Sequence, residues 1–196
     1  MVSVQNIAVS SQISVNSNGE LLMPFIAKQD YEVYFRETLS EYGGAIARVV
    51  SSYEMIRALQ EELYQEISIA LWKALAKFDN QSSLKTYILS IAHKRAISHV
   101  AKYAKEPRTS DIDNFELHGE DSPAEKIQQT QTMNRLLHAV TQLCLMDRQL
   151  VTLALEGVSY KEIADILGVT TNLVGVKLNR AKSKLKALMV VGEMND

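Results

Sequence analysis

Polar and basic side chains that can contact nucleic acid gather near the end of this chain. Residues 171–189 hold five basic residues and no acidic one. Among them, amide groups suit base edges and cations suit phosphates, whereas an outward-facing valine suits a thymine methyl group. The candidate DNA contacts are therefore Thr171, Asn172, Val176, Lys177, Asn179, Arg180 and Lys182.

Two helices separated by a glycine turn must position these side chains. Ser159 and Glu162 have the spacing of a capping box, which predicts a helix start at Tyr160. Gly168 can end that helix with a positive φ, and Thr170 or Thr171 can cap the next one. A buried stripe then recurs every three or four residues at Val174, Leu178, Ala181, Leu185 and Leu188. The pattern predicts a helix-turn-helix whose second helix enters a major groove, and the alternative is a helical hairpin with a solvated basic face.

The net charge of −2 hides a division of the chain into charged blocks. Residues 1–66 hold four basic and nine acidic side chains, and residues 73–108 hold eight basic and two acidic ones. Residues 109–125 add six acidic side chains and neither Lys nor Arg. Two basic blocks separated by an acidic one favour nucleic-acid binding at two places. Residues 106–125, bounded by Pro107 and Pro123, predict a flexible acidic linker.

Helical periodicity dominates the first block. Apolar residues mark amphipathic stretches over residues 31–42, 46–53 and 63–78. A polar loop over residues 79–83, with helix-capping residues at its end, precedes another helix. Only three prolines and eight glycines occur in 196 residues, which argues against a β-rich fold. We expect an all-α protein of two small helical domains joined by the linker, with Trp72 in the first core.

Several functional classes find no support in the sequence. No apolar run approaches the ~20 residues of a membrane span, so we expect no membrane insertion. The single cysteine, Cys144, excludes a disulfide within the chain; we expect a buried thiol and a cytoplasmic protein. His93 and His99 lack partners at metal-ligand spacing, and no phosphate loop or nucleophile motif occurs. We therefore expect no enzyme activity, no cofactor, no metal and no small-molecule substrate.

The segment Glu62–Lys105 carries three recognisable features in order. Glu62, Gln65, Glu66 and Trp72 lie on one helix, a short polar loop follows, and Ser82 or Ser83 with Thr86, Tyr87, Ile91 and Ala92 fits Ser-x-x-x-Thr-(Tyr/Trp)-x-x-x-Ile-Ala. These features resemble region 2 of bacterial extracytoplasmic-function (ECF) sigma factors, and residues 144–189 resemble region 4. The resemblance implies a region 2 domain over residues 28–105, a linker over 106–125 and a region 4 domain over 126–190. A mobile extension over residues 1–27 and a tail over 191–196 complete the expected organisation.

The resemblance also implies roles for particular residues. Glu62, Gln65 and Glu66 would bind core RNA polymerase, and the helix-turn-helix would read the −35 element of promoter DNA. The loop over residues 78–83 would accept a base flipped from the −10 element, at the cost of unstacking. The −10 contacts would come from Asn80, Ser82, Ser83, Lys85, Tyr87, His93, Lys94 and Arg95. Members of the family commonly bind an anti-sigma factor as a further partner.

The chain departs from the family pattern in three places. His93-Lys94 replaces a common Arg-Asn, and Leu145-Met146 replaces Leu-Pro. Residues 173–176 read Leu-Val-Gly-Val where Thr-Val-Lys-Ser is common, which removes one cation and one hydroxyl from the DNA face. An alternative function also stays open: a free-standing helix-turn-helix regulator that binds an operator without polymerase. The two charged blocks and the polar loop favour the sigma factor, and no dimerisation helix or ligand domain is evident for a free-standing regulator.

Overall fold

The computed structural model describes residues 14–15, 21–22, 25–104 and 124–193. Within these ranges the chain forms seven helices and two short antiparallel strands, β1 (Ser14–Val15) and β2 (Leu21–Leu22). The all-α prediction is confirmed. The linker expected over residues 106–125 lies outside the described residues except for its last two, and so does most of the extension expected over residues 1–27.

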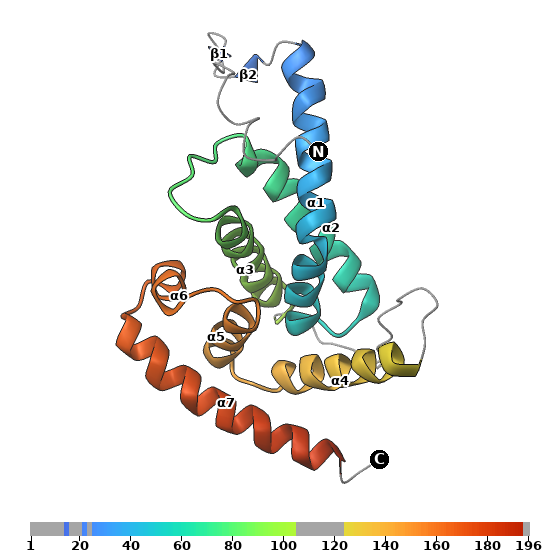
Figure 1. Cartoon of the computed structure of the whole chain (residues 1–196), viewed down its shortest axis with the longest axis vertical. Coiled ribbons are helices and arrows are strands. Elements are labelled where there is room, and N and C mark those ends of the chain that lie inside the picture. Colours follow the sequence, from blue (N-terminus) through green and yellow to red (C-terminus); the bar gives the residue numbers. More distant parts are fainter. Residues whose placement is uncertain (1–13, 16–20, 23–24, 105–123, 194–196) are drawn as a thin grey trace.

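Three helices build the first half: α1 (Phe25–Tyr53), α2 (Arg57–Leu75) and α3 (Leu84–Tyr103) (Figure 1). The two amphipathic stretches predicted over residues 31–42 and 46–53 are joined in the single helix α1. Gly43 lies between them and allows close packing, because a Cβ there would come 3.1 Å from the Tyr64 hydroxyl oxygen of α2. A glycine in this helix therefore serves helix packing and does not break the helix.

The core of the first half is apolar and includes an aromatic cluster. Ile46, Leu63 and Ile88 come from the three helices and have no exposed surface. The Trp72 ring packs edge-on against Tyr31 and Phe35, with ring centroids 4.7 Å and 5.0 Å away. Trp72 is half-buried, so it packs at the edge of the core, in contact with aromatic residues of α1.

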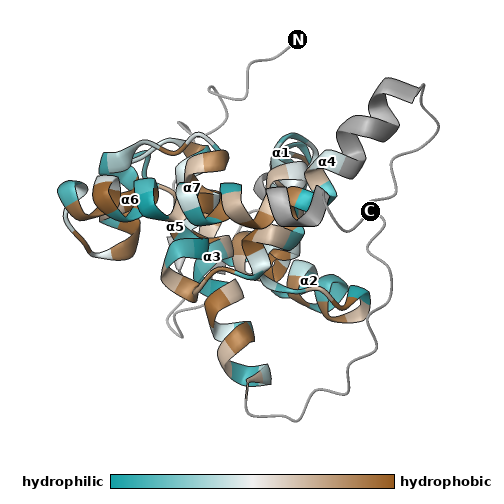
Figure 2. Ribbon diagram, turned by 90° about the horizontal axis from the view of Figure 1, so that it is seen from below, coloured by the Kyte–Doolittle hydropathy of each residue, from teal (hydrophilic) through white to brown (hydrophobic). Residues whose placement is uncertain are grey.

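Four helices build the second half: α4 (Ala124–Thr141), α5 (Leu145–Leu155), α6 (Tyr160–Leu167) and α7 (Thr171–Glu193). Figure 2 shows hydrophobic and hydrophilic residues alternating along the helices, as amphipathic helices require. Cys144 is the N-cap residue of α5 and is exposed, so the expected buried thiol is wrong. The reason is its place in the turn between α4 and α5, where the chain reverses at the surface.

The helix-turn-helix has the local structure that the sequence predicts. Ser159 and Glu162 form the capping box, and α6 starts at Tyr160. Gly168 adopts a φ of 66° in the left-handed region and ends α6. Thr170 caps α7 by accepting a hydrogen bond from the backbone N–H of Leu173 at 3.3 Å. The apolar stripe is buried at Val174, Leu178, Ala181 and Leu185, and Leu188 is half-buried.

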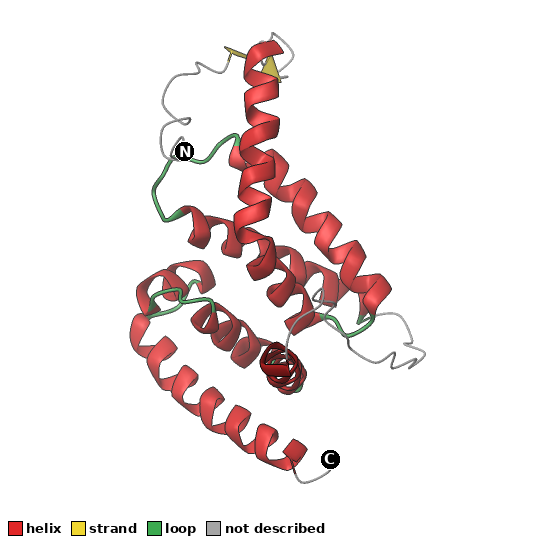
Figure 3. Cartoon of the chain, turned by 45° about the vertical axis from the view of Figure 1, so that its right-hand side comes forward, coloured by secondary structure: helices red, strands yellow, loops and turns green. Residues whose placement is uncertain are grey.

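The two halves pack against each other. The buried apolar side chains of both form one continuous cluster, and α1 contacts α4 and α5. Arg48 of α1 binds the carboxylate of Glu156 at the end of α5 through two hydrogen bonds of 2.6 Å and 2.9 Å. In Figures 1 and 3, α7 lies on the side of the molecule away from the start of α1, so its outer face is open.

Candidate nucleic-acid interface

The outer face of α7 is hollowed. Most of the residues predicted to read DNA line one open hollow of about 480 Å³: Thr171, Asn172, Val176, Asn179 and Arg180, together with Gly175. Lys177 is half-buried and Lys182 is exposed, and neither lines this hollow. The structure therefore brings five of the seven candidates together and places the two lysines outside the hollow.

The support of α7 comes from two neighbouring helices. Ile163 and Ala164 of α6 are buried in the cluster that contains Val174 and Leu178 of α7. Lys184 of α7 donates a hydrogen bond of 2.6 Å to Asp147 of α5, which raises the pKa of Lys184 and lowers that of Asp147. These contacts hold α7 against α5 and α6 and leave its other face outward.

Tyr160 is an exposed aromatic residue that sequence reasoning did not place at this site. It is the first residue of α6, and its side chain is 45% exposed. A Cβ built on Gly175 would lie 3.8 Å from Cε2 of Tyr160, so the ring stands beside the hollow of α7. The sequence held one signal for this placement. Tyr160 is an aromatic residue directly after the capping serine, Ser159, and it is not part of the apolar stripe of the helix.

The loop between α2 and α3, drawn in green in Figure 3, contains a residue with positive φ and a helix cap. Asn80 has a φ of 60°, the one positive φ of a non-glycine residue in the described ranges. Ser83 caps α3 by accepting a hydrogen bond of 3.1 Å from the backbone N–H of Thr86. Asn80 and Ser83 are exposed, whereas Ser82 is half-buried. The predicted loop and its cap are confirmed, and an exposed amide stands at its tip.

The candidate residues of α3 do not share one face. Lys85 and Lys94 are nine residues apart, which is two and a half helical turns, so they project from opposite sides. Tyr87 packs its ring against Phe78 at 4.8 Å, and its hydroxyl donates to the Ala74 carbonyl at 3.1 Å. Lys94 and Arg95 are both exposed. The exposed cations beyond the loop are therefore Lys94 and Arg95, whereas Lys85 and Tyr87 are half-buried.

His93 cannot contact DNA in this structure, and this prediction is wrong. Its side chain is 1% exposed, Nδ1 lies 2.8 Å from the Tyr53 hydroxyl, and burial lowers its pKa to about 3. His99 is also buried, with Nε2 3.6 Å from the Glu54 carboxylate. The amphipathic pattern of α3 was assigned with both histidines outside the buried stripe, whereas the packing of α1 extends that stripe over them.

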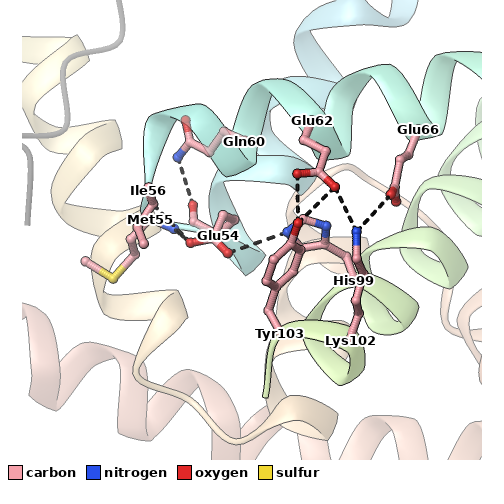
Figure 4. Close-up of polar contacts among 9 residues, drawn as sticks. All are labelled: Glu54, Met55, Ile56, Gln60, Glu62, Glu66, His99, Lys102 and Tyr103. Atoms are coloured by element: carbon pink, nitrogen blue, oxygen red, sulfur yellow. Dashed lines mark hydrogen bonds and ion pairs between the residues drawn. The ribbon is translucent and has the colours of Figure 1, made fainter. Parts of the chain in front are cut away.

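The carboxylates predicted to bind polymerase lie on α2, beside α3 (Figure 4). Glu62 accepts hydrogen bonds of 2.9 Å from Lys102 and 2.8 Å from the Tyr103 hydroxyl, which lower the pKa of its carboxyl group. Glu66 lies 4.0 Å from the same Lys102 amine, and Gln65 is exposed. Sequence reasoning missed Lys102 and Tyr103, because their contact with Glu62 spans about 40 residues of sequence and depends on how α2 packs on α3.

The comparison with known proteins agrees with this arrangement. The profile of Sigma-70 region 2 matches residues 39–106, and that of Sigma-70 region 4 matches residues 133–185. The chain is 24% identical over 173 residues to RNA polymerase sigma factor NccH of Alcaligenes xylosoxydans xylosoxydans, which covers 83% of this chain and 90% of that protein. It is 26% identical over 183 residues to the ECF RNA polymerase sigma-E factor of Escherichia coli K12, which covers 88% and 95%.

A solved structure shows the same fold. The sigma factor RpoE of Bartonella quintana, in complex with the anti-sigma factor NepR, superposes with a TM-score of 0.62 and 18% identity. The match covers 80% of this chain and 97% of RpoE. None of the helices in the described ranges is long and apolar enough to cross a membrane.

Both conserved regions occur here in the family order, and the similarity to the curated relatives extends over most of each protein. The chain therefore belongs to the sigma-70 family of bacterial RNA polymerase sigma factors. Within that family it is an ECF sigma factor, an alternative sigma factor that directs RNA polymerase to initiate transcription.

Proposed function

We propose that the first half of this ECF sigma factor binds core polymerase and the −10 element, and that α7 reads the −35 element. The observation that supports this division most directly is the hollow on α7. Amide, hydroxyl, guanidinium and apolar groups line one outward face of the second helix of a helix-turn-helix, which is the geometry of major-groove reading.

The proposed polymerase contact is the side of α2 that carries Glu62, Gln65 and Glu66. Gln65 is exposed and Glu66 half-buried, so both are accessible to a partner. Glu62 already accepts hydrogen bonds from Lys102 and Tyr103. We propose that these two residues orient the Glu62 carboxylate for docking on a basic surface of polymerase.

The proposed −10 contact combines the loop with cations farther along α3. Asn80, Ser82 and Ser83 supply hydrogen-bonding groups for an extruded base, and Lys94 and Arg95 supply positive charge for the single strand. Lys85 and Tyr87 stay in the proposed contact at its edge, since both retain some exposure. His93 is left out because it is buried.

The proposed setting is the cytoplasm, where polymerase and promoter DNA are found. The protein would act by binding alone, without enzymatic activity. An anti-sigma factor is a proposed further partner, because the related RpoE was solved with one. A free-standing regulator is not favoured, since such a protein would have no use for region 2.

The test is transcription in vitro from a pool of promoter fragments of the source genome, with core polymerase and with or without this protein. New start sites that share an upstream pair of motifs would support the proposal and give both promoter elements. Sequence-selective and salt-sensitive binding of duplex DNA by the protein alone, without any initiation, would overturn it in favour of the free-standing regulator.

A further inference from the structure

The centre of the reading face of α7 is apolar and flanked by amides. Asn172, Val176 and Asn179 recur at spacings of four and three residues, so they lie on one side of the helix. Val176 is 45% exposed, and both asparagines are exposed. An asparagine amide is matched to the N6 and N7 atoms of adenine, and an apolar side chain to the C5-methyl group of thymine.

Residue 175, which lines the hollow beside Val176, is a glycine. The space that a Cβ would fill is empty, and the Tyr160 ring lies 3.8 Å beyond the position of that Cβ. Gly175 does not have a positive φ, so its backbone conformation does not require glycine. The glycine thus leaves a gap at residue 175, next to Val176 and on the side of the Tyr160 ring.

We propose that Val176, Gly175 and Tyr160 form a binding site for the C5-methyl group of a thymine in the −35 element, with Asn172 and Asn179 reading neighbouring adenines. This inference rests on the proposed function and specifies which bases the site prefers. The occupant is duplex DNA, because the exposed cations Arg180 and Lys182 lie on or beside this face and residues 171–189 contain no acidic residue. A partner that docked through apolar surface alone would leave these charges uncompensated.

The apolar centre changes what the reading face can recognise. A lysine and a serine at residues 175 and 176 would offer a cation and a hydroxyl group. Here the same positions offer a gap and two methyl groups. Specificity therefore shifts from hydrogen bonding toward shape and methyl recognition, so A·T pairs are favoured.

The experiment replaces single thymines of the −35 element by deoxyuridine in a promoter found with core polymerase. Deoxyuridine keeps every hydrogen-bonding group and removes only the methyl group. We expect initiation at limiting sigma factor to fall roughly three- to fivefold at one thymine, the effect of removing one buried methyl group. Deoxyuridine at the remaining thymines of the promoter should change initiation by less than twofold relative to the unsubstituted promoter.

Two variants and a control assign the effect to this site. In Val176→Ala the penalty for deoxyuridine disappears at that position, because the contacting methyl groups are gone. In Gly175→Ala the added Cβ fills the gap, so deoxyuridine becomes equal to or better than thymine. The control Lys182→Ala weakens binding to the thymine and the deoxyuridine forms of the promoter equally, as expected for a phosphate contact.

Three outcomes would overturn the inference while leaving the proposed function intact. They are initiation without any response to deoxyuridine, a response that persists in Val176→Ala, and a −35 element without an A·T pair. Absence of initiation with core polymerase would overturn the proposed function itself. The two failures are therefore distinguishable in one assay.

Discussion

The Thr86 hydroxyl donates a hydrogen bond of 2.7 Å to the Glu162 carboxylate and so joins α3 of the first half to α6 of the second. Ser83, which caps α3, donates to the same hydroxyl at 2.7 Å. Glu162 in turn completes the capping box of α6 with Ser159. Hydrogen bonds from Ser159 and then from Thr86 lower the pKa of Glu162. The first turns of two helices beside the proposed DNA contacts are therefore connected by one chain of hydrogen bonds.

Thr86→Val should remove this connection while keeping the shape of the side chain. We expect a loss of about 1 kcal/mol in the free energy of unfolding, the usual net value of a hydrogen bond. Urea denaturation followed by circular dichroism measures it. Thr86→Ser would also remove a buried methyl group worth about 0.8 kcal/mol, so the control is Thr86→Val in a Glu162→Ala background, where the loss should be smaller. An equal loss in that background would show that the hydrogen bond to Glu162 contributes nothing.

Arg48→Ala should loosen the contact between the two halves. Glu156 is 6% exposed, so without Arg48 its carboxylate loses a bidentate partner at a buried position. Because Arg48 is itself partly exposed, we expect a loss of about 1–3 kcal/mol, below the range for fully buried pairs. Small-angle X-ray scattering should show a larger radius of gyration. Arg36→Ala, an exposed arginine of the same helix, is the matched control and should change neither quantity.

Gly168→Ala should destabilise the helix-turn-helix, because residue 168 has a φ of 66° that a Cβ disfavours. We expect a loss of about 1 kcal/mol in the free energy of unfolding. Gly175→Ala is the matched control in the neighbouring helix, where the new Cβ makes only an ordinary contact of 3.8 Å. That variant should be as stable as the wild type, or more stable by up to about 1 kcal/mol. Thermal unfolding of the two proteins separates the effects, and similar losses would contradict the prediction.

His93 should make stability depend on pH. Burial lowers its pKa from the ordinary 6.5 to about 3, so below pH 6.5 the unfolded chain binds a proton that the folded protein does not. The contribution of His93 is complete above pH 6.5 and is lost as the pH falls toward 3. Between pH 7.5 and 5.5 we expect a loss of about 1.4 kcal/mol from this residue. His93→Gln should lack that part of the pH dependence in urea titrations, and parallel profiles would contradict it.

Substitutions on α2 should weaken binding to core polymerase without affecting the fold. We expect Gln65→Ala combined with Glu66→Ala to lower the affinity by about tenfold, which corresponds to about 1.4 kcal/mol. Fluorescence anisotropy with labelled protein measures it. Glu37→Ala removes an exposed carboxylate from α1 and is the control. An unchanged affinity in the double variant would place the polymerase contact elsewhere.

The sequence predicts local structure here better than it predicts contacts between distant segments. The capping box at Ser159, the end of α6 at Gly168 and the cap at Ser83 depend on residues within a few positions of each other, and all three predictions are confirmed. The exposure of His93 was wrong because α1 covers a side of α3 that an isolated helix would leave open.

The same limit applies to the candidate site. The polar face of α7 could be predicted because it lies on one helix, where spacing determines direction. Tyr160 could not be placed beside Gly175 without knowing the angle between α6 and α7. The contact of Lys102 and Tyr103 with Glu62 depends in the same way on the packing of α3 against α2.

The apolar cluster that runs without interruption through both halves has a consequence for how the protein melts. Loss of either half would expose apolar surface on the other, so partial unfolding is penalised in both directions. Heating should therefore produce one calorimetric transition, with equal calorimetric and van't Hoff enthalpies. The unit that unfolds cooperatively in this protein therefore contains both region 2 and region 4, the two regions that define its family.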